Sequence, residues 1–477
     1  MDQSWETVVG LEVHVQLNTA TKQFCGDANE FGAPPNLHTS SISLAHPGTL
    51  PHINETSIKS AIKLALATGA EINFENRFDR KHYFYADLPK GYQITQDDLP
   101  ISVGGGLTLD NGRYIRFHHT HMEEDAGKSL HHIDDKLTYV DLNRAGVPLL
   151  ELVTEPDFRS GDEVLEFIGK LQQIVRYLGI SDGNMEQGSL RCDCNVSVRP
   201  MGTDTYGERC EIKNMNSKKF ARQAVAYESK RQIKAIESGQ KITMQTLHFD
   251  PVKGTTTPTR DKETAHDYRY LPDPDLPPIF ITQDLVNQLK EEMPLMPEAL
   301  KARLKEVHQL SSEQAYILSS SLDTSSYFFE ILNFYKNPKQ LANFFINTLI
   351  PYTKANDIEI NSIKVSSATW SEYLNLIASE KINRKDASDK LFPALIKDPS
   401  LSPTQLSESL DIIQSNNPNI NDQIIAQVLE AYPDEVKKYR SGKKALVGFF
   451  IGEAMKKAQG KANPKTLKSD LIKALSS

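Results

Sequence analysis

The sequence predicts an α+β protein, in which an N-terminal antiparallel-sheet domain with packed helices is followed by an all-α helical domain and an all-α tail domain. Up to about residue 293 the chain shows period-two alternation, hairpin turns such as Asn111-Gly112 and frequent Gly and Pro, which are typical of antiparallel sheets. After Pro297, segments such as "EALKARLKEV" and "LVGFFIGEAMKKA" have helical spacing. We expect domains over residues 1–293, 294–405 and 406–477.

Three segments justify this outline in chain order. The stretch "ETVVGLEVHVQL" alternates strictly between apolar and polar residues, which predicts a strand. Ser160 and Glu163 have the spacing of a capping box, and apolar residues then repeat at helical spacing as far as Gly179. The proline-rich residues 270–278 cannot continue a central strand, so they predict a stiff extended connector.

Composition limits the class of protein. The 477 residues are 39% apolar and 24% charged, which is ordinary for a globular chain of several domains. No apolar stretch is long enough for a transmembrane helix, and "MDQSWETVVG" lacks the features of a secretory signal. We expect a cytoplasmic protein without a membrane partner, whose four cysteines are reduced.

Charge is distributed unevenly along the chain. Residues 431–477 contain eleven Lys/Arg and four Asp/Glu, a local balance of +7 within a total of −8, so the preceding 430 residues sum to −15. A basic tail on an acidic body suggests a surface for a polyanion. A solvated, lysine-rich pair of helices is the alternative.

Candidate ligands for a cation occur in two of the predicted strands. Glu12 and His14 share the polar face of the first strand, where alternate residues lie ~7 Å apart and can share one ion. Glu151 lies in the apolar run "VPLLELVTEP", where a glutamate rarely stays buried without a partner. The alternatives are an exposed polar strand face for the first pair and a structural ion pair for Glu151.

The segment "THMEEDAGKS" ends like a phosphate-binding P-loop. A P-loop needs a glycine five positions before Gly127, where this chain has Met122. The intervening carboxylates would also repel a phosphate held only by backbone amides, so we reject the P-loop. Carboxylates instead suit a divalent cation. Glu123 and Glu124 point to opposite faces of a continuing strand, so only a bend or a strand end lets both reach one site.

At this point long motifs match a known family. The segments "GLEVHVQLNT", "FDRKHYFYADLPKGYQITQ", "HMEEDAGKS", "VDLNRAGVPLLELVTEPDFRS", "GSLRCDCNVSVRP", "EIKNMNS", "DYRYLPDPDLPP" and "GKANP" resemble the GatB family of aspartyl/glutamyl-tRNA amidotransferase subunits. The match follows nearly the whole chain in consistent order. The family's N-terminal cradle domain carries its kinase and transamidase chemistry.

This resemblance implies a ligase that forms a carbon–nitrogen bond with glutamine as nitrogen donor. The family phosphorylates the side-chain carboxylate of Glu-tRNA(Gln) or Asp-tRNA(Asn) with ATP and Mg²⁺, and ammonia then displaces the phosphate. The implied partners are the glutaminase, the small third protein of the GatCAB heterotrimer, and mischarged tRNA. Which of the two tRNAs is the substrate, and which residues contact adenine, stays open.

The resemblance also implies the residues of the site. Its metal ligands fall on Glu12, His14, Glu124 and Glu151, with Glu123 adjacent, and it favours Glu124 over Glu123 where strand geometry cannot choose. Because His14 is an unusual ligand for Mg²⁺, Mn²⁺ or Zn²⁺ would also suit the site.

Two further segments supply candidate catalytic residues. In "FDRKHYFYADLPKGYQ" these are Lys81, Tyr83, Tyr85 and Lys90, and the family assigns both lysines to its ammonia passage. A lysine relays ammonia by deprotonation only if burial lowers its pKa, so gating is an equal alternative. Simple sheet packing is a further alternative for this segment.

The polar face of "SLRCDCNVSVRP" adds three more candidate catalytic residues and, with other basic residues, a set for ATP. The candidate catalytic residues are Arg191, Asp193 and Asn195, and the candidate ATP-binding residues are Arg144, Arg191 and Lys213. An exposed sheet face is the alternative. Cys192 and Cys194 share an apolar face and predict core thiols.

The chain departs from the family at a zinc site. Many members carry four cysteines where this chain has only Cys25, with Ser40 and Ser43 in the later positions. One thiol cannot build a tetrahedral structural site, so we expect no structural zinc.

The basic tail resembles the family's tRNA-gripping domain. Six lysines are candidate phosphate contacts: Lys443, Lys444, Lys456, Lys457, Lys461 and Lys465. Two other classes of protein remain. A non-catalytic tRNA-binding scaffold would not need the carboxylates, and a stand-alone metal hydrolase would not need the basic tail.

Overall fold

The computed structural model describes residues 4–131, 133–134, 136–213, 215–261, 267–414, 418–458 and 464–476. The chain divides into two compact units, Met1–Pro297 and Glu298–Ser477. Each unit is described by itself below. The further division of the second unit near residue 405 stays a prediction.

The first unit contains all the strands of the described residues. These are β1 (Trp5–Gln16), β2 (Glu71–Ile72), β3 (Glu75–Asn76), β4 (Asp79–His82), β5 (Tyr92–Thr95), β6 (Ser102–Val103), β7 (Gly106–Thr108), β8 (Tyr114–Glu124), β9 (Lys128–Leu130), β10 (Tyr139–Asp141), β11 (Pro148–Thr154), β12 (Leu190–Pro200), β13 (Cys210–Lys213), β14 (Gln245–Asp250), β15 (Thr255–Asp261), β16 (Leu271–Pro272) and β17 (Ile279–Phe280). Its helices are α1 (Glu55–Thr68), α2 (Gly161–Tyr177), α3 (Lys218–Glu237) and α4 (Gln283–Glu292), and α5 (Pro297–Glu306) begins at its boundary.

The second unit is helical throughout its described residues. Its elements after α5 are α6 (Ser312–Leu318), α7 (Leu322–Phe334), α8 (Pro338–Phe344), η1 (Phe345–Leu349), α9 (Ile350–Ala355), η2 (Ile360–Ser362), α10 (Ser367–Ala378), α11 (Arg384–Asp386), η3 (Ala387–Leu391), α12 (Phe392–Lys397), α13 (Pro403–Ser409), α14 (Pro418–Ala431), α15 (Pro433–Arg440), η4 (Lys444–Leu446), α16 (Val447–Lys457) and α17 (Pro464–Ser476).

A large sheet organises the first unit. Its strand order is β15-β14-β13-β12-β1-β11-β8-β6-β2, and β7 adds to β8 through the predicted turn at Asn111-Gly112. The pairs along this path are antiparallel except β13 with β14, which is parallel. The parallel pair arises because α3 connects the two strands as a crossover, which no hairpin signal in the sequence reveals.

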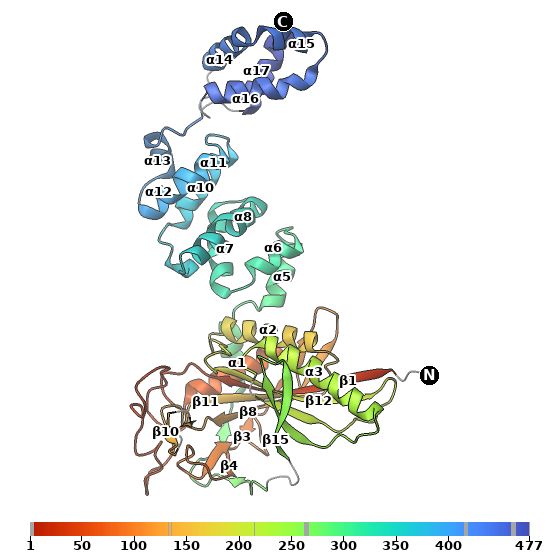
Figure 1. Cartoon of the computed structure of the whole chain (residues 1–477). Coiled ribbons are helices and arrows are strands. Elements are labelled where there is room, and N and C mark those ends of the chain that lie inside the picture. The colour runs from red at the N-terminus through yellow and green to blue at the C-terminus, as the bar shows by residue number, and fades with distance from the viewer. Residues whose placement is uncertain are drawn as a thin grey trace. The chain divides into compact units, whose positions relative to one another are not determined.

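One face of this sheet packs against helices. Figure 1 shows α1, α2 and α3 on the same side of the sheet. Val9, Leu11, Val13 and Val15 of β1 are buried in one apolar core with residues of these helices. The predicted alternation of β1 is therefore confirmed, and its polar residues lie on the opposite face of the sheet.

The predicted start of α2 is confirmed with one difference. The Ser160 hydroxyl accepts a hydrogen bond from the Glu163 backbone N–H at 3.2 Å. The Glu163 carboxylate accepts from the Arg159 backbone N–H at 2.6 Å, one residue earlier than a capping box requires. The helix is fixed at its first turn, and it buries Phe167, Ile168 and Leu171 under the sheet.

The proline-rich connector is only partly extended. Leu271 and Pro272 form the short strand β16, which pairs with β4 at the edge of a three-stranded sheet, β16-β4-β5. An edge position tolerates Pro272 because its missing N–H would face away from the ladder. This small sheet contacts the end of β8 through the Gln93 side-chain amide, which donates to the Glu124 carbonyl at 2.7 Å.

Candidate active site

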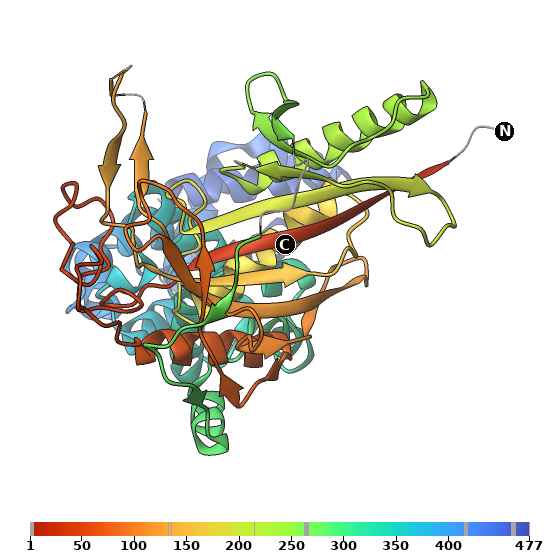
Figure 2. The same ribbon diagram turned by 90° about the horizontal axis from the view of Figure 1, so that it is seen from below.

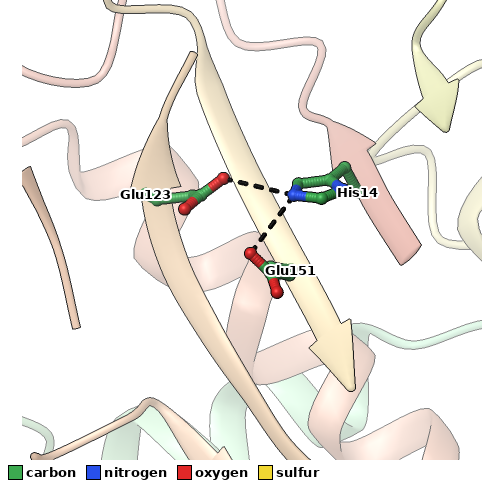
Figure 3. A group of neighbouring side chains, drawn as sticks. All are labelled: His14, Glu123 and Glu151. Carbon is green, nitrogen blue, oxygen red and sulfur yellow. Dashed lines mark ion pairs between the residues drawn. The ribbon is translucent and has the colours of Figure 1, made fainter. Parts of the chain in front are cut away.

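Three strands bring one imidazole and two carboxylates together on the polar face of the large sheet. His14 of β1 lies with its Nε2 3.6 Å from Glu123 Oε1 of β8 and 3.2 Å from Glu151 Oε2 of β11 (Figure 3). These ligand atoms all lie within 4.8 Å of one another. The set can hold a divalent cation, because carboxylate oxygens and a neutral imidazole are its ordinary ligands.

The register of the sheet explains why His14, Glu123 and Glu151 lie close together. His14 lies directly opposite Glu151, and Glu151 lies directly opposite His121 on the next strand. Figure 2 shows β1, in red, beside the long yellow-green β12, whose Arg191 is the other neighbour of His14. The row across four strands therefore reads Arg191, His14, Glu151, His121, and Glu123 reaches it from two residues further along β8.

His121 is a site residue that the sequence reasoning missed. Its Nε2 lies 3.4 Å from Glu151 Oε2 and 3.7 Å from Glu123 Oε2, and the residue is buried. The signal was present, since His119, His121 and Glu123 alternate along β8 and so share one face. Glu151 is thus partly buried and has two imidazole partners, in agreement with the partner that its apolar surroundings predicted.

Electrostatics couple these groups. Burial favours neutral imidazole, but the adjacent Glu151 and Glu123 raise the pKa of His121 to about 10. The pKa of His14 is also raised, with burial opposing Glu151 and Glu123. For Glu151 burial acts upward, yet His121 and His14 hold its pKa well below the usual range. Positive charge therefore stabilises the two carboxylates, and either protonated imidazoles or a bound cation can provide it.

Glu124 faces away from this cluster. Its carboxylate pairs with the Lys90 ammonium and accepts a hydrogen bond from the Ile94 backbone N–H at 3.0 Å. Because neighbouring residues of β8 point to opposite faces of the strand, Glu123 takes the place that the resemblance gave to Glu124. The geometry thus favours Glu123 over Glu124 as a ligand.

Glu12 belongs to a second carboxylate group with Asp193 and Glu211, whose oxygens also lie within 4.8 Å of one another. Glu12 accepts from the Asn195 side-chain amide at 3.0 Å. The Lys213 ammonium lies 3.0 Å from both Asp193 and Glu211. The expectation that Glu12 and His14 share one ion therefore differs from the structure, which places them in neighbouring groups.

The same contacts show how the predicted ATP-binding residues are held. Lys213 is exposed but paired with Asp193 and Glu211, and these carboxylates raise its pKa against the effect of partial desolvation. Arg191 Nη2 donates to Asp125 at 2.7 Å, while Arg191 Nε is buried without a hydrogen-bond partner in the described chain. Arg144 donates to the carbonyls of Ala126 and Gly127 at 2.9 and 2.6 Å. Arg191 thus retains a free donor beside His14, which suits an anion.

Lys81 is the residue of the segment "FDRKHYFYADLPKGYQ" that interacts electrostatically with Glu123 and Glu151 of the cluster. Burial would lower the pKa of Lys81, but the tyrosine Tyr270 and the carboxylates Glu123 and Glu151 raise it. The direction of this shift favours gating over relay by a neutral lysine, and the role of Lys81 stays a prediction. Tyr83 is half-buried and its hydroxyl donates to Gln93 at 3.4 Å, whereas Tyr85 is 63% exposed.

The former P-loop residues continue as a strand. Lys128 begins β9, which pairs with β10, so the element that directly follows Gly127 is a strand and not a helix. A P-loop needs that helix, so its rejection is confirmed.

The Cys25 loop is held by hydrogen bonds around one aspartate. Asp27 accepts from the Ser43 hydroxyl at 2.6 Å and from the Ser40 backbone N–H at 3.0 Å. Cys25 is buried, and burial raises the pKa of its thiol to about 11. Cys192 and Cys194 are buried core thiols, as predicted.

The lysines of the tail lie on a helical body with its own core, built around Val428, Phe450, Leu467 and Leu471. Lys443, Lys444, Lys456 and Lys457 are exposed. Lys444 lies over the Tyr439 ring at 4.2 Å and Lys456 pairs with Glu453 at 2.6 Å. Lys461 lies outside the described residues, and of Lys465 only its place in α17 is described.

A sheet with a carboxylate–imidazole cluster that can hold a cation, followed by a helical unit with a basic end, defines a class of protein with one surface for a cation and another for a polyanion. The model of the GatB/GatE catalytic domain matches residues 7–287, and the model of the GatB domain matches residues 326–475. The chain therefore belongs to the GatB family of aspartyl/glutamyl-tRNA(Asn/Gln) amidotransferase subunits.

Curated relatives agree along the full length, and each is named as the B-type subunit of aspartyl/glutamyl-tRNA(Asn/Gln) amidotransferase. The Salinibacter ruber protein is 43% identical over 99% of this chain and 97% of its own. The Geotalea daltonii protein is 44% identical over 99% of both chains. The Pelagibacter ubique protein is 42% identical over 99% of this chain and 97% of its own. In the described chain, no helix is long and apolar enough to cross a membrane.

Proposed function

We propose that this chain is the kinase and amidation subunit of a glutamine-dependent tRNA amidotransferase that works in the cytoplasm. It would use ATP and Mg²⁺ to phosphorylate the side-chain carboxylate of Glu-tRNA(Gln), Asp-tRNA(Asn) or both. The observation that carries the proposal is the His14–Glu123–Glu151 cluster beside the unpaired Nε of Arg191. A cation seat next to a free guanidinium donor suits a phosphate in transfer.

The reaction has two steps. An oxygen of the side-chain carboxylate attacks the γ-phosphorus, and ADP leaves with the electrons of the broken P–O bond. Ammonia then attacks the acyl carbon, loses a proton and expels phosphate. A carboxylate is a poor acyl donor, so the first step creates the leaving group that the second step needs.

The chain's residues have distinct parts in these steps. A divalent cation on His14, Glu123 and Glu151 would neutralise phosphate charge when bound. Arg191 Nε would donate to a phosphate oxygen, while Asp125 fixes its guanidinium through Nη2. Lys81, whose ammonium lies over the Tyr268 ring at 4.8 Å and whose pKa is raised by Tyr270, Glu123 and Glu151 against the effect of burial, would order or gate the approach of ammonia.

Partner proteins would complete the enzyme. We propose that a glutaminase supplies ammonia and that a small third protein completes the heterotrimer, since the relatives' name describes one part of a larger enzyme. The Lys90–Glu124 pair, at the wall of a cavity that also contains Tyr92 and Gly146, is our candidate gate for the ammonia passage.

The test is amidation by the assembled complex. Wild type should convert Glu-tRNA(Gln) or Asp-tRNA(Asn) only with ATP and a nitrogen donor. Glu151→Gln should lower that rate by at least about a hundredfold, because the cation seat loses a charged ligand, while tRNA affinity is retained. Glu71→Gln, an exposed glutamate of the same sheet, is the matched control. Full amidation by Glu151→Gln would instead favour the alternative of a non-catalytic tRNA-binding scaffold.

A further inference from the structure

A second cavity lies within the helical unit, separate from the carboxylate cluster. It has a volume of about 670 Å³ and is lined by α8, η1, α10, η3 and the segment 380–384. Small-ligand sites commonly have roughly 300–1,000 Å³. Amide side chains dominate its polar lining, namely Gln340, Asn343, Asn347, Asn383 and Gln414.

Two π-helical turns shape the wall of this cavity. In η1 the Ile350 N–H donates five residues back to the Phe345 carbonyl, and in η3 the Phe392 N–H donates to the Ala387 carbonyl. Pro351 and Pro393 each stand two residues after the end of a turn, and a proline cannot donate to the carbonyl four residues before it. π-Helical turns within α-helices are rare and occur frequently at functional sites. Here they bring Asn347 and Ser388 to the cavity.

The floor of the cavity holds an unpaired hydroxyl. Tyr373 is only 2% exposed and lines the cavity, yet its hydroxyl has no hydrogen-bond partner in the described chain. Burial alone raises the pKa of this phenol. Its ring packs against Phe344 with centroids 5.4 Å apart. Buried tyrosine hydroxyls usually have a partner, so this one is available to a ligand.

The lining also includes the Glu380 carboxylate and the Arg384 guanidinium, and its amide-rich remainder suits a flat ligand that offers both donors and acceptors. The Gln340 and Asn343 side-chain oxygens already accept from Tyr335 and Gln314, and the Asn383 amide caps α11 through Asp386, so their remaining NH2 groups and the Asn347 amide face the ligand. Such amides match the hydrogen-bonding edges of nucleobases, and unstacked bases pack on aromatic side chains. The exposed Arg384 at the rim could meet a phosphate beside the base. We propose that this cavity binds one unstacked nucleobase of the bound tRNA, an inference that rests on the proposed function.

The test measures binding of an unacylated tRNA(Gln) transcript to the full complex over a salt series. Tyr373→Phe should weaken binding about three- to tenfold, the effect of one lost hydrogen bond, without changing the salt dependence. Arg384→Gln should reduce the slope of log affinity against log salt by about one. Tyr352→Phe is the matched control, because this half-buried tyrosine packs on Phe392 outside the cavity.

Dimethyl sulfate probing of the bound transcript would locate the base. Wild type and Tyr352→Phe should protect a base that becomes reactive in Tyr373→Phe and in Asn347→Ala, a change on the exposed rim that leaves the apolar floor intact. Unchanged affinity and protection in both cavity variants would overturn the inference, as would a loss accompanied by an altered salt slope. Failure of wild type to amidate, with these binding effects intact, would count only against the proposed function.

Discussion

Adjacent residues of one strand can belong to two different sites. Glu123 meets His14 across β11, while Glu124 turns to Lys90 and the Ile94 backbone. Both carboxylates are buried, so burial alone does not tell a ligand from a structural ion pair. Only the partners separate the two, and they come from opposite faces of the sheet.

A prediction follows from this separation. Glu123→Gln should weaken Mn²⁺ binding by about ten- to a hundredfold, because amide oxygen replaces a charged ligand. Glu124→Gln should keep Mn²⁺ affinity within about threefold, and it should lower stability, since Lys90 loses its buried partner. Electron paramagnetic resonance of bound Mn²⁺ measures the affinity, and a thermal melt measures the stability. Equal loss of affinity in both variants would contradict the assignment.

Part of the site could be predicted from residue patterns alone. Alternation placed Glu12 and His14 on a polar face, and the apolar neighbours of Glu151 predicted its buried partner. The choice between Glu123 and Glu124 was beyond the sequence, because it depends on how β8 is registered against β11. The division of Glu12 from His14 depends on Lys213 and Asn195, which arrive from strands distant in sequence.

At the scale of elements, α3 decides the topology of the sheet edge. It connects β13 to the parallel β14, and its buried Glu228 accepts hydrogen bonds from Arg231 at 2.6 Å and from the Thr256 hydroxyl of β15 at 2.8 Å. The Gln232 amide donates to the same carboxylate at 2.9 Å. One charged side chain thus ties the crossover helix to the strand beyond it. The sequence predicted the helix that begins after Ser160, but it predicted neither α3 nor the parallel return to β14.

Removal of the Glu228 carboxylate should destabilise the edge of the large sheet that β14 and β15 form. Glu228→Ala should lower the free energy of unfolding of the first unit by ~3 kcal/mol, since it leaves Arg231 and Thr256 without their buried acceptor. Lys230→Ala, an exposed position on the same helix, should change it by less than about 0.5 kcal/mol. Urea unfolding followed by circular dichroism, with hydrogen exchange in β14 and β15, measures both. A stable Glu228→Ala variant with protected strands would disprove the fastening role.

At the scale of the whole molecule, the residues that we propose for catalysis and those that we propose for RNA binding belong to separate compact units. The carboxylate cluster belongs to the first unit, whereas the exposed lysines belong to a helical body with its own apolar core. The uneven charge of the chain suggested a polyanion surface in the tail, and the binding of RNA there stays a prediction. The cavity beside the π-helical turns was not foreseen, because proline within a helix indicates a disturbance and not the pocket that results.

Because the two sets of residues lie in separate units, removal of the tail should weaken tRNA binding without changing Mn²⁺ binding. A chain that ends at residue 405 should lose at least about tenfold in tRNA affinity and show a shallower salt dependence, because lysine contacts to phosphate are lost. Its Mn²⁺ affinity should not change, since the ligands lie on the sheet of the first unit. The paired substitution Lys443→Gln and Lys444→Gln should reduce the salt slope by about two with the tail still present. Nitrocellulose filter binding over a salt series measures each effect. If the shortened chain binds tRNA as tightly as the full chain, the tail does not hold the RNA, and the exposed lysines are then simply a solvated helical surface.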